Sequence, residues 1–282
     1  MKTRPPTSVV GGRSAGRKGM PRVLAVLSTV AILAYLLPLH PVEAEIVPAK
    51  ELNALLGDLN SSDPVVVAKA VNEIKSQRAK QAIPALVRVV QHPDEIVRLT
   101  VIEALSDFGP DAAPAVPALT AALKDKDPMI REAAALALRS MGKQSAPAVP
   151  ALVSALGDES KPVRDAVILA LANIGEASVQ DLIKGLESQD ETVRTPAATA
   201  LGRIGAPAVP ALVAVLKKGD PRSAKAAAKA LSEVGTPAVA PLIELLTTAK
   251  AETSKLAGET LAAIGAAAVP ALVDALRKGK QP

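Results

Sequence analysis

Cysteine and tryptophan are absent from this chain of 282 residues, which contains one tyrosine, one phenylalanine and two histidines. The absence of cysteine excludes disulfide bonds, thiolate catalysis and cysteine-ligated metal sites. Because Tyr35 and Phe108 are the only aromatic residues, a hydrophobic core has to be built from alanine, leucine, valine and isoleucine. Side chains of this size favour closely packed helices.

Residues that could perform catalysis or bind a cofactor are also few. Beyond residue 44 the only histidine is His92, which precedes a proline and is interpreted as a solvated turn residue. The paired carboxylates Asp158-Glu159 and Asp190-Glu191 fall between predicted helices, where capping and interaction with the helix dipole explain them. No cluster of histidine and carboxylate residues has the spacing of a metal site. We therefore expect no catalytic residue, no cofactor and no metal, and a protein that is not an enzyme.

Six glycines, here called the closing glycines, recur at almost constant intervals. The intervals are 33, 33, 30, 30 and 30 residues, and the glycines are Gly109, Gly142, Gly175, Gly205, Gly235 and Gly265. Self-similarity with a period of this length is typical of stacked helical repeats. The closing glycines therefore set the register in which the rest of the chain can be compared.

Each repeat contains two amphipathic segments. In the first, apolar residues recur at i, i+3, i+4 and i+7, as in Val149, Leu152, Val153 and Leu156, which is the pattern of one helix face. The second carries an arginine 11 residues before the closing glycine in four of the copies, and the glycine permits a left-handed C-cap. Small alanines in the second segment let helices approach closely. The pattern predicts an all-α solenoid of about seven helix pairs and a final unpaired helix from Val269 to Leu276.

The repeated phrase A-V-P-A-L-V-x-A-L, a turn, and V-R-x-x-A-x-x-A-L-x-x-I-G resembles HEAT repeats of the type first named from phycobilisome bilin lyases. The resemblance is strong over residues 81–276 and weak over 49–80. It implies a curved right-handed stack whose second helices line a concave, partner-binding side. It also implies a ladder of aspartate and arginine between repeats, incomplete toward the C-terminus. The residues that match this pattern are Asp94 with Arg98, Asp127 with Arg131, and Asp190 with Arg194.

The N-terminal segment has the three parts of a secretory signal peptide. Residues 1–22 are basic, residues 23–37 are apolar, and Val42-Glu43-Ala44 places small residues at a cleavage site. We predict cleavage after Ala44 and export to the periplasm or the medium. The alternative is an uncleaved single membrane anchor, although spanning helices need about 20 apolar residues. Residues 45–80 are then a degenerate N-terminal capping repeat, and residues 81–282 are the repeat array with a polar C-terminal cap.

Removal of residues 1–44 changes the charge balance. The whole chain has 33 basic and 28 acidic residues, but residues 1–44 contain six of the basic residues and one of the acidic ones. The remaining chain is neutral. Nucleic acids are therefore not an expected partner, because binding phosphates needs a basic surface.

The predicted partner-binding surface is the exposed side of the second helices. Counting back ten and six residues from the closing glycines gives the candidates Glu132, Leu136, Asp165, Leu169, Thr195, Thr199, Lys225 and Lys229. A partly apolar groove between charged ends suits a protein or an extended peptide; the alternative is an ordinary solvated face. The sequence thus favours an exported, non-enzymatic interaction scaffold. The other hypotheses are a bilin-lyase-like subunit that assists chromophore attachment and a membrane-anchored assembly factor.

Overall fold

The computed structural model describes residues 48–218 and 220–278. The predicted signal peptide, its cleavage after Ala44 and the alternative membrane anchor lie outside the described residues. Seven helices come first in their pairs: α2 (Ala49–Asp58), α4 (Ile83–Val89), α6 (Val116–Ala122), α8 (Val149–Ser154), α10 (Val179–Leu186), α12 (Val209–Lys218) and α14 (Thr236–Thr248). Seven come second: α3 (Pro64–Ser76), α5 (Glu95–Phe108), α7 (Pro128–Met141), α9 (Lys161–Ile174), α11 (Glu191–Ile204), α13 (Pro221–Val234) and α15 (Ala251–Ile264). The last described helix is α16 (Val269–Lys278). The predicted all-α solenoid of seven pairs and a final helix is confirmed.

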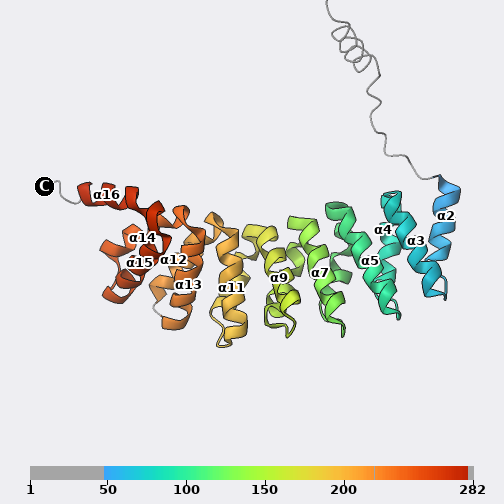
Figure 1. Ribbon diagram of the computed structural model, residues 1–282, viewed down its shortest axis with the longest axis horizontal. Coiled ribbons are helices and arrows are strands. Elements are labelled where there is room, and N and C mark those ends of the chain that lie inside the picture. The colour runs from blue at the N-terminus through green and yellow to red at the C-terminus, as the bar shows by residue number, and fades with distance from the viewer. Residues whose placement is uncertain (1–47, 219, 279–282) are drawn as a thin grey trace, which may run out of the picture. The chain divides into compact units, whose positions relative to one another are not determined.

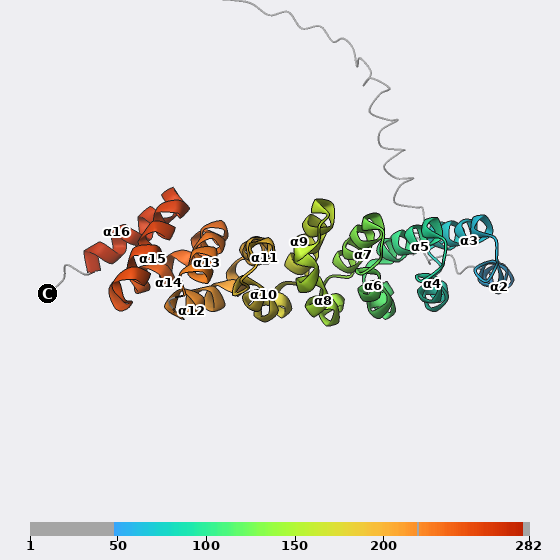
Figure 2. The same cartoon turned by 90° about the horizontal axis from the view of Figure 1, so that it is seen from below.

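The helices form two layers, which Figures 1 and 2 show in perpendicular views. Each second helix packs against the second helix before and after it, from α3 to α15. The first helices lie together in the other layer (Figure 2). Because contacts run mainly between neighbouring repeats, stability is shared between the repeats and their interfaces. The curvature implied by the resemblance stays a prediction.

The core between the layers is almost entirely aliphatic in the described residues, with Phe108 and Met141 as the exceptions. Leucine, valine and isoleucine from both layers fill it, with fully buried side chains that include Leu152 and Leu212. Alanines occupy the contacts between successive second helices, and Ala137, Ala170 and Ala200 have no exposed surface. The close approach that these small residues were expected to allow is therefore present.

The turn at each closing glycine differs from the predicted left-handed C-cap in one respect. All six glycines have a positive φ, between 54° and 78°, as expected. Their ψ values lie between −129° and −137°, whereas a left-handed helical residue has ψ near +47°. This conformation is that of the first central residue of a type II′ turn. The reason is that the next helical segment starts within one residue of the glycine, so a single residue reverses the chain.

Replacing Gly175 by alanine is expected to lower the free energy of unfolding by about 1–3 kcal/mol, because L-residues avoid this region of φ and ψ. A Cβ at Gly175 would meet no atom within 4 Å, so the cost reports backbone conformation alone. The control is Gly258, which lies inside α15. Replacing it by alanine is expected to raise the free energy of unfolding by about 0.5–1 kcal/mol. Urea unfolding measures both changes; a neutral Gly175→Ala variant would contradict the strained-turn interpretation.

The C-terminal end of the described array presents an apolar face. Val269, Val273 and Leu276 are exposed on α16, at the i, i+4 and i+7 spacing of one helix face. The predicted polar cap begins at Arg277, which is exposed on α16, and its residues 279–282 lie outside the described residues. One face of α16 is therefore apolar, and the cap stays a prediction.

Two stretches, Lys161–Leu186 and Ala251–Arg277, are long and apolar enough to cross a membrane by length and composition, with mean hydropathies of 1.4 and 1.7. Each consists of two helices joined at a closing glycine. The chain turns inside both stretches, and residues such as Leu171, Leu182 and Leu261 pack into the array. Half of the most apolar window of the first stretch is buried in the array, but only 22% of that of the second stretch, which includes the exposed apolar residues of α16.

Candidate functional site

One continuous stripe of side chains runs along the outside of the second-helix layer. It consists of the residues 13, 10 and 6 positions before each closing glycine, a spacing that places them on one face of a helix. Every member is exposed or half-buried. From α5 to α15 the members are Ile96, Leu99, Glu103, Met129, Glu132, Leu136, Pro162, Asp165, Leu169, Thr192, Thr195, Thr199, Arg222, Lys225, Lys229, Glu252, Lys255 and Glu259. We call this set the outer stripe.

The structure places all eight predicted site residues on the outer stripe. Leu136 and Leu169 are half-buried, so they offer edges of their side chains and not a deep apolar groove. Asp165 forms an exposed ion pair of 2.5 Å with Lys161, and Lys225 and Lys229 are exposed. The stripe is thus accessible along its length, and binding by these residues stays a prediction.

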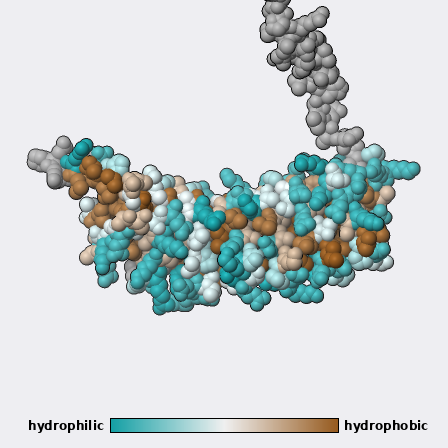
Figure 3. Space-filling view, in the orientation of Figure 1, coloured by the Kyte–Doolittle hydropathy of each residue, from teal (hydrophilic) through white to brown (hydrophobic). Residues whose placement is uncertain are grey.

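Three exposed apolar residues in the first turns of second helices were missed by the sequence analysis. Val65 in α3, Ile96 in α5 and Met129 in α7 are 59%, 66% and 61% exposed. Ile96 and Met129 each precede a buried residue, Val97 or Ile130, and one residue corresponds to 100° around a helix. The sequence could have indicated their exposure, because each lies 100° around the helix from a residue that the apolar pattern places in the core. Figure 3 shows hydrophobic surface gathered over α3, α5 and α9, and a mostly hydrophilic surface over α11 and α13.

The outer stripe is hollowed between successive second helices in the C-terminal half. The cavity between α9 and α11 has a volume of about 370 Å³, and acidic residues dominate its charge; we call it the acidic hollow. The next, between α11 and α13, measures about 280 Å³ and is the basic hollow. The acidic hollow is lined by Gly157, Asp158, Glu159, Arg164, Glu191, Thr192, Thr195 and Pro196. The basic hollow is lined by Glu191, Arg194, Thr195, Ala198, Arg222, Lys225, Ala226 and Lys229.

Two buried arginines of the second helices reach across to the next repeat. Arg98 donates from Nε and Nη2 to the two carboxylate oxygens of Asp125, at 2.9 and 3.3 Å. Arg131 does the same to Asp158, at 2.7 and 2.9 Å. Bidentate contacts of this kind are among the strongest hydrogen bonds in proteins. A ladder between repeats is therefore present, with two rungs among the described residues.

The aspartates of these rungs are not those that the resemblance indicated, which corrects the sequence analysis. Asp94, Asp127 and Asp190 instead accept hydrogen bonds from backbone N–H groups and cap α5, α7 and α11. A carboxylate at the N-cap position is already occupied by those donors. The arginine therefore binds the aspartate two residues before the N-cap of the following second helix. This aspartate is Asp125 where Asp127 is the N-cap, and Asp158 where Ser160 is the N-cap.

The rung between Arg131 and Asp158 also determines the charge state of the carboxylate. Its hydrogen bond with Arg131 holds the pKa of Asp158 below its ordinary value, against the opposing effect of burial. In the following repeats the aspartate position is taken by Ser188 and Lys218. The ladder therefore stops because the carboxylates are missing. The arginines continue for two more repeats, to Arg194, and the next arginine position is taken by Ala224.

Comparison with known proteins identifies the repeat. Sequence models of HEAT repeats match residues 52–115, 149–232, 179–257 and 209–282, and a further HEAT repeat model matches residues 115–145. This chain belongs to the HEAT-repeat family. A search of curated proteins finds no match.

Solved structures that resemble this HEAT array include natural and designed solenoids. The complex of CpcE and CpcF of phycocyanin lyase from Nostoc sp. PCC7120 is 25% identical, with a TM-score of 0.41 and coverage of 82% of this chain and 95% of that one. The archaeal HEAT-like repeats protein from Thermococcus onnurineus NA1 is 13% identical, with a TM-score of 0.44 and coverage of 77% and 98%. Computationally designed armadillo repeat proteins for modular peptide recognition are 21% identical, with a TM-score of 0.37 and coverage of 64% and 99%.

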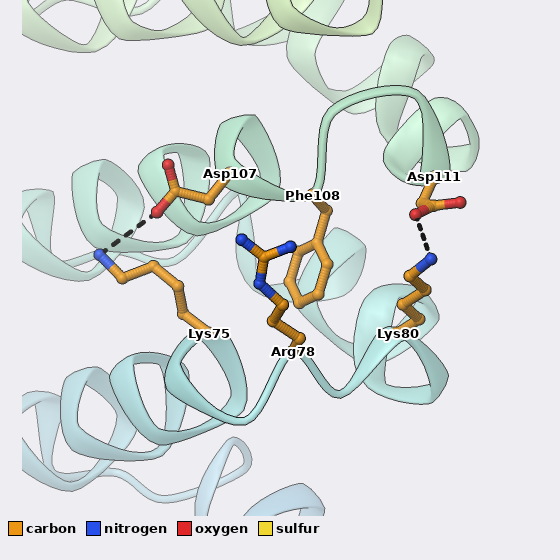
Figure 4. Close-up of a pocket in the computed structure, with 6 residues that line it drawn as sticks. All are labelled: Lys75, Arg78, Lys80, Asp107, Phe108 and Asp111. Atoms are coloured by element: carbon orange, nitrogen blue, oxygen red, sulfur yellow. Dashed lines mark ion pairs between the residues drawn. The ribbon is translucent and has the colours of Figure 1, made fainter. Parts of the chain in front are cut away.

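A further cavity of about 390 Å³ lies where the first two HEAT repeats meet (Figure 4). Ion pairs join Lys75 to Asp107 at 3.6 Å and Lys80 to Asp111 at 2.5 Å. Arg78, between the two lysines, has φ +49° and occupies the position that a closing glycine takes in later repeats. Exposed ion pairs contribute little to stability, so we interpret this cluster as a surface contact between the ends of α3 and α5. Among residues 48–218 and 220–278, no group of three histidine or carboxylate side chains is placed to hold a metal ion.

Proposed function

We propose that this HEAT protein is a non-enzymatic scaffold that binds a partner protein or an extended peptide along the outer stripe. Arrays of this class are typical of protein–protein interaction. The observation that carries the proposal is the outer stripe itself, which crosses successive second helices and is covered by no other described part of the chain. Its composition changes from apolar and acidic on α5, α7 and α9 to basic on α13. Such a graded surface fixes the orientation of a bound segment.

The proposed site of action is outside the cytoplasm. The basic residues 1–22, the apolar residues 23–37 and the small residues around Ala44 support export with cleavage after Ala44. A single N-terminal membrane anchor is the alternative. Mass spectrometry of the exported protein distinguishes them, because a peptide that spans Ala44 and Glu45 would exclude cleavage at this bond.

A lyase-type subunit that assists bilin attachment is the second candidate. The repeat phrase, which resembles the type named from phycobilisome lyases, favours it. The scarcity of aromatic and histidine side chains opposes it, because a tetrapyrrole is usually held by such groups. Pigment absorbance in the purified protein would favour the lyase-type role over the scaffold.

The scaffold proposal is tested by placing charge on the two half-buried leucines of the outer stripe. The protein is isolated from the exported fraction with its bound partner, and a double variant, Leu136→Asp with Leu169→Asp, is compared with wild type. The control puts the same two charges on exposed residues of the first-helix layer, Ser154→Asp with Ala214→Asp.

We expect the stripe variant to lose the partner and the control to keep it, with both retaining the helical circular dichroism of wild type. Retention of the same partner by a folded stripe variant would refute the proposed surface.

A further inference from the structure

The two complete rungs of the ladder show what an arginine at this position binds. In Arg98 and Arg131, Nη1 donates to backbone carbonyl oxygens of the preceding turn, six and five residues back. The remaining edge, Nε and Nη2, holds a carboxylate in a bidentate contact. The turn thus orients the guanidinium, and the free edge faces the next repeat.

Arg194 has the contacts from Nη1 to the turn but not the bidentate contact to a carboxylate. Its Nη1 donates to the carbonyl oxygens of Ser188 and Gln189, at 2.7 and 3.2 Å. No hydrogen bond joins its Nε or Nη2 to another described residue. The residue that should supply the carboxylate is Lys218, which forms an ion pair with Glu187 at 2.6 Å. Arg194 therefore presents an oriented carboxylate-binding edge without an internal carboxylate.

Arg164 has the same open edge in different surroundings. Its Nη1 bonds to the carbonyl oxygens of Asp158 and Glu159, and Ser188 stands where the carboxylate is needed. The acidic hollow beside it contains the side chains of Asp158, Glu159 and Glu191. These carboxylates oppose the approach of another anion.

The surroundings of Arg194 favour an anion. The basic hollow places Arg222, Lys225 and Lys229 beside it against one carboxylate, Glu191. Asp190 and Asp220 also lie near, and both are engaged as N-caps: Asp190 accepts from the backbone N–H of Thr192, and Asp220 accepts from that of Ser223. On its other side Lys225 lines a separate hollow with Glu252 and Glu259 of α15. None of the three cations from α13 forms an ion pair with a described carboxylate, although Arg222 donates from Nη1 to the side-chain oxygen of Gln189.

We infer that Arg194 is a receptor for a carboxylate side chain of an acidic, extended peptide segment of a partner protein. This inference rests on the proposed scaffold function and names the chemistry of its partner. The open edge of Arg194 takes one carboxylate, as Arg98 and Arg131 do internally. Arg222, Lys225 and Lys229 continue the positive charge along α13 for about 10 Å, the length of about three residues of extended chain. Successive acidic side chains of one segment therefore match the hollow.

The test supplies the missing internal carboxylate. The full chain is titrated against a fluorescein-labelled octaglutamate peptide by fluorescence anisotropy, with octaglutamine as the neutral control. Lys218→Asp places a carboxylate at the rung position, where it competes for Arg194. Lys217→Asp makes the same change of charge on the neighbouring exposed residue, outside the rung position.

We expect Lys218→Asp to weaken octaglutamate binding by roughly tenfold or more, and Lys217→Asp to weaken it by less than about threefold, because a bidentate contact exceeds the general effect of charge. Arg194→Lys is expected to lower the affinity for octaglutamate by about tenfold, since a lysine ammonium cannot make the bidentate contact of a guanidinium. Arg164→Lys is expected to leave this affinity unchanged. A melting temperature of Lys218→Asp at or above that of wild type shows that the variant is folded and that the rung has formed.

Equal losses for Lys218→Asp and Lys217→Asp would overturn the role of Arg194 and leave only non-specific attraction. Absence of octaglutamate binding to wild type would overturn the inference as well. The scaffold proposal would survive either result if Leu136→Asp with Leu169→Asp still releases the partner. If octaglutamate does not bind as expected and the folded variant Leu136→Asp with Leu169→Asp also keeps its partner, the outer stripe is rejected as a binding surface.

Discussion

Asp158→Asn is expected to lower the free energy of unfolding by about 3 kcal/mol at pH 7, because it leaves a buried arginine without its counter-charge. The side chains of Arg131 and Asp158 are 9% and 10% exposed. An asparagine retains one acceptor oxygen but turns an NH₂ group toward the guanidinium, so the bidentate contact is lost. Urea unfolding followed by circular dichroism measures the change.

Glu159→Gln is the matched control for this rung. Glu159 also approaches Arg131, at 3.6 Å, but its side chain is 90% exposed. Exposed pairs contribute about 0–1 kcal/mol, so we expect a small change. If the two variants lose equal stability, the rung is no stronger than a surface ion pair.

The contribution of this rung should depend on pH in a defined direction. Arg131 holds the pKa of Asp158 below its ordinary value of 3.8. A carboxylate whose pKa is lowered in the folded state stabilises the protein above its unfolded pKa, and this stability is lost as pH falls through the folded pKa. The difference between wild type and Asp158→Asn should therefore be constant near neutral pH and shrink below about pH 4. A difference that stays constant into strong acid would contradict this assignment.

Leu212→Ala is expected to lower the free energy of unfolding by about 2–5 kcal/mol, through lost burial and the cavity that remains. Leu212 belongs to α12 and has no exposed surface. In a repeat array the loss is expected to be greatest in the helices that contact α12, namely α10, α13 and α14. Urea unfolding measures the total, and amide hydrogen exchange locates it.

Leu276→Ala is the control, because it makes the same change of side chain at an exposed position. Leu276 is 66% exposed on α16, and substitutions of exposed residues usually change stability by less than about 0.5 kcal/mol. A loss at Leu276 as large as that at Leu212 would mean that the apolar face of α16 is covered in solution.

The repeat architecture was predictable because its signals are local. The apolar spacing of Val149, Leu152, Val153 and Leu156 lies within one helix, and each closing glycine acts on one turn. The ψ value of those glycines was not predictable from glycine content alone, since glycine tolerates both left-handed and type II′ geometry. The direction in which the chain leaves the helix selects between them.

The ladder illustrates a second kind of limit. Asp94 and Asp127 precede their arginines by four residues and have the right chemistry, but their carboxylates are already bonded to backbone N–H groups. The partner of Arg98 is Asp125, 27 residues away. A pairing at that distance depends on how two repeats stack, which no local pattern encodes.

By itself, the sequence determined the helix pairs, their register and the surface position of the residues ten and six positions before the closing glycines, because helical periodicity and glycine turns act over a few residues. Only the tertiary structure decided which aspartate each arginine binds, that Ile96 and Met129 point outward, and that Arg194 is left with an open edge among cations. These features arise where one repeat meets the next, and contacts between repeats depend on the packing distance and angle of helices that the sequence only places in order.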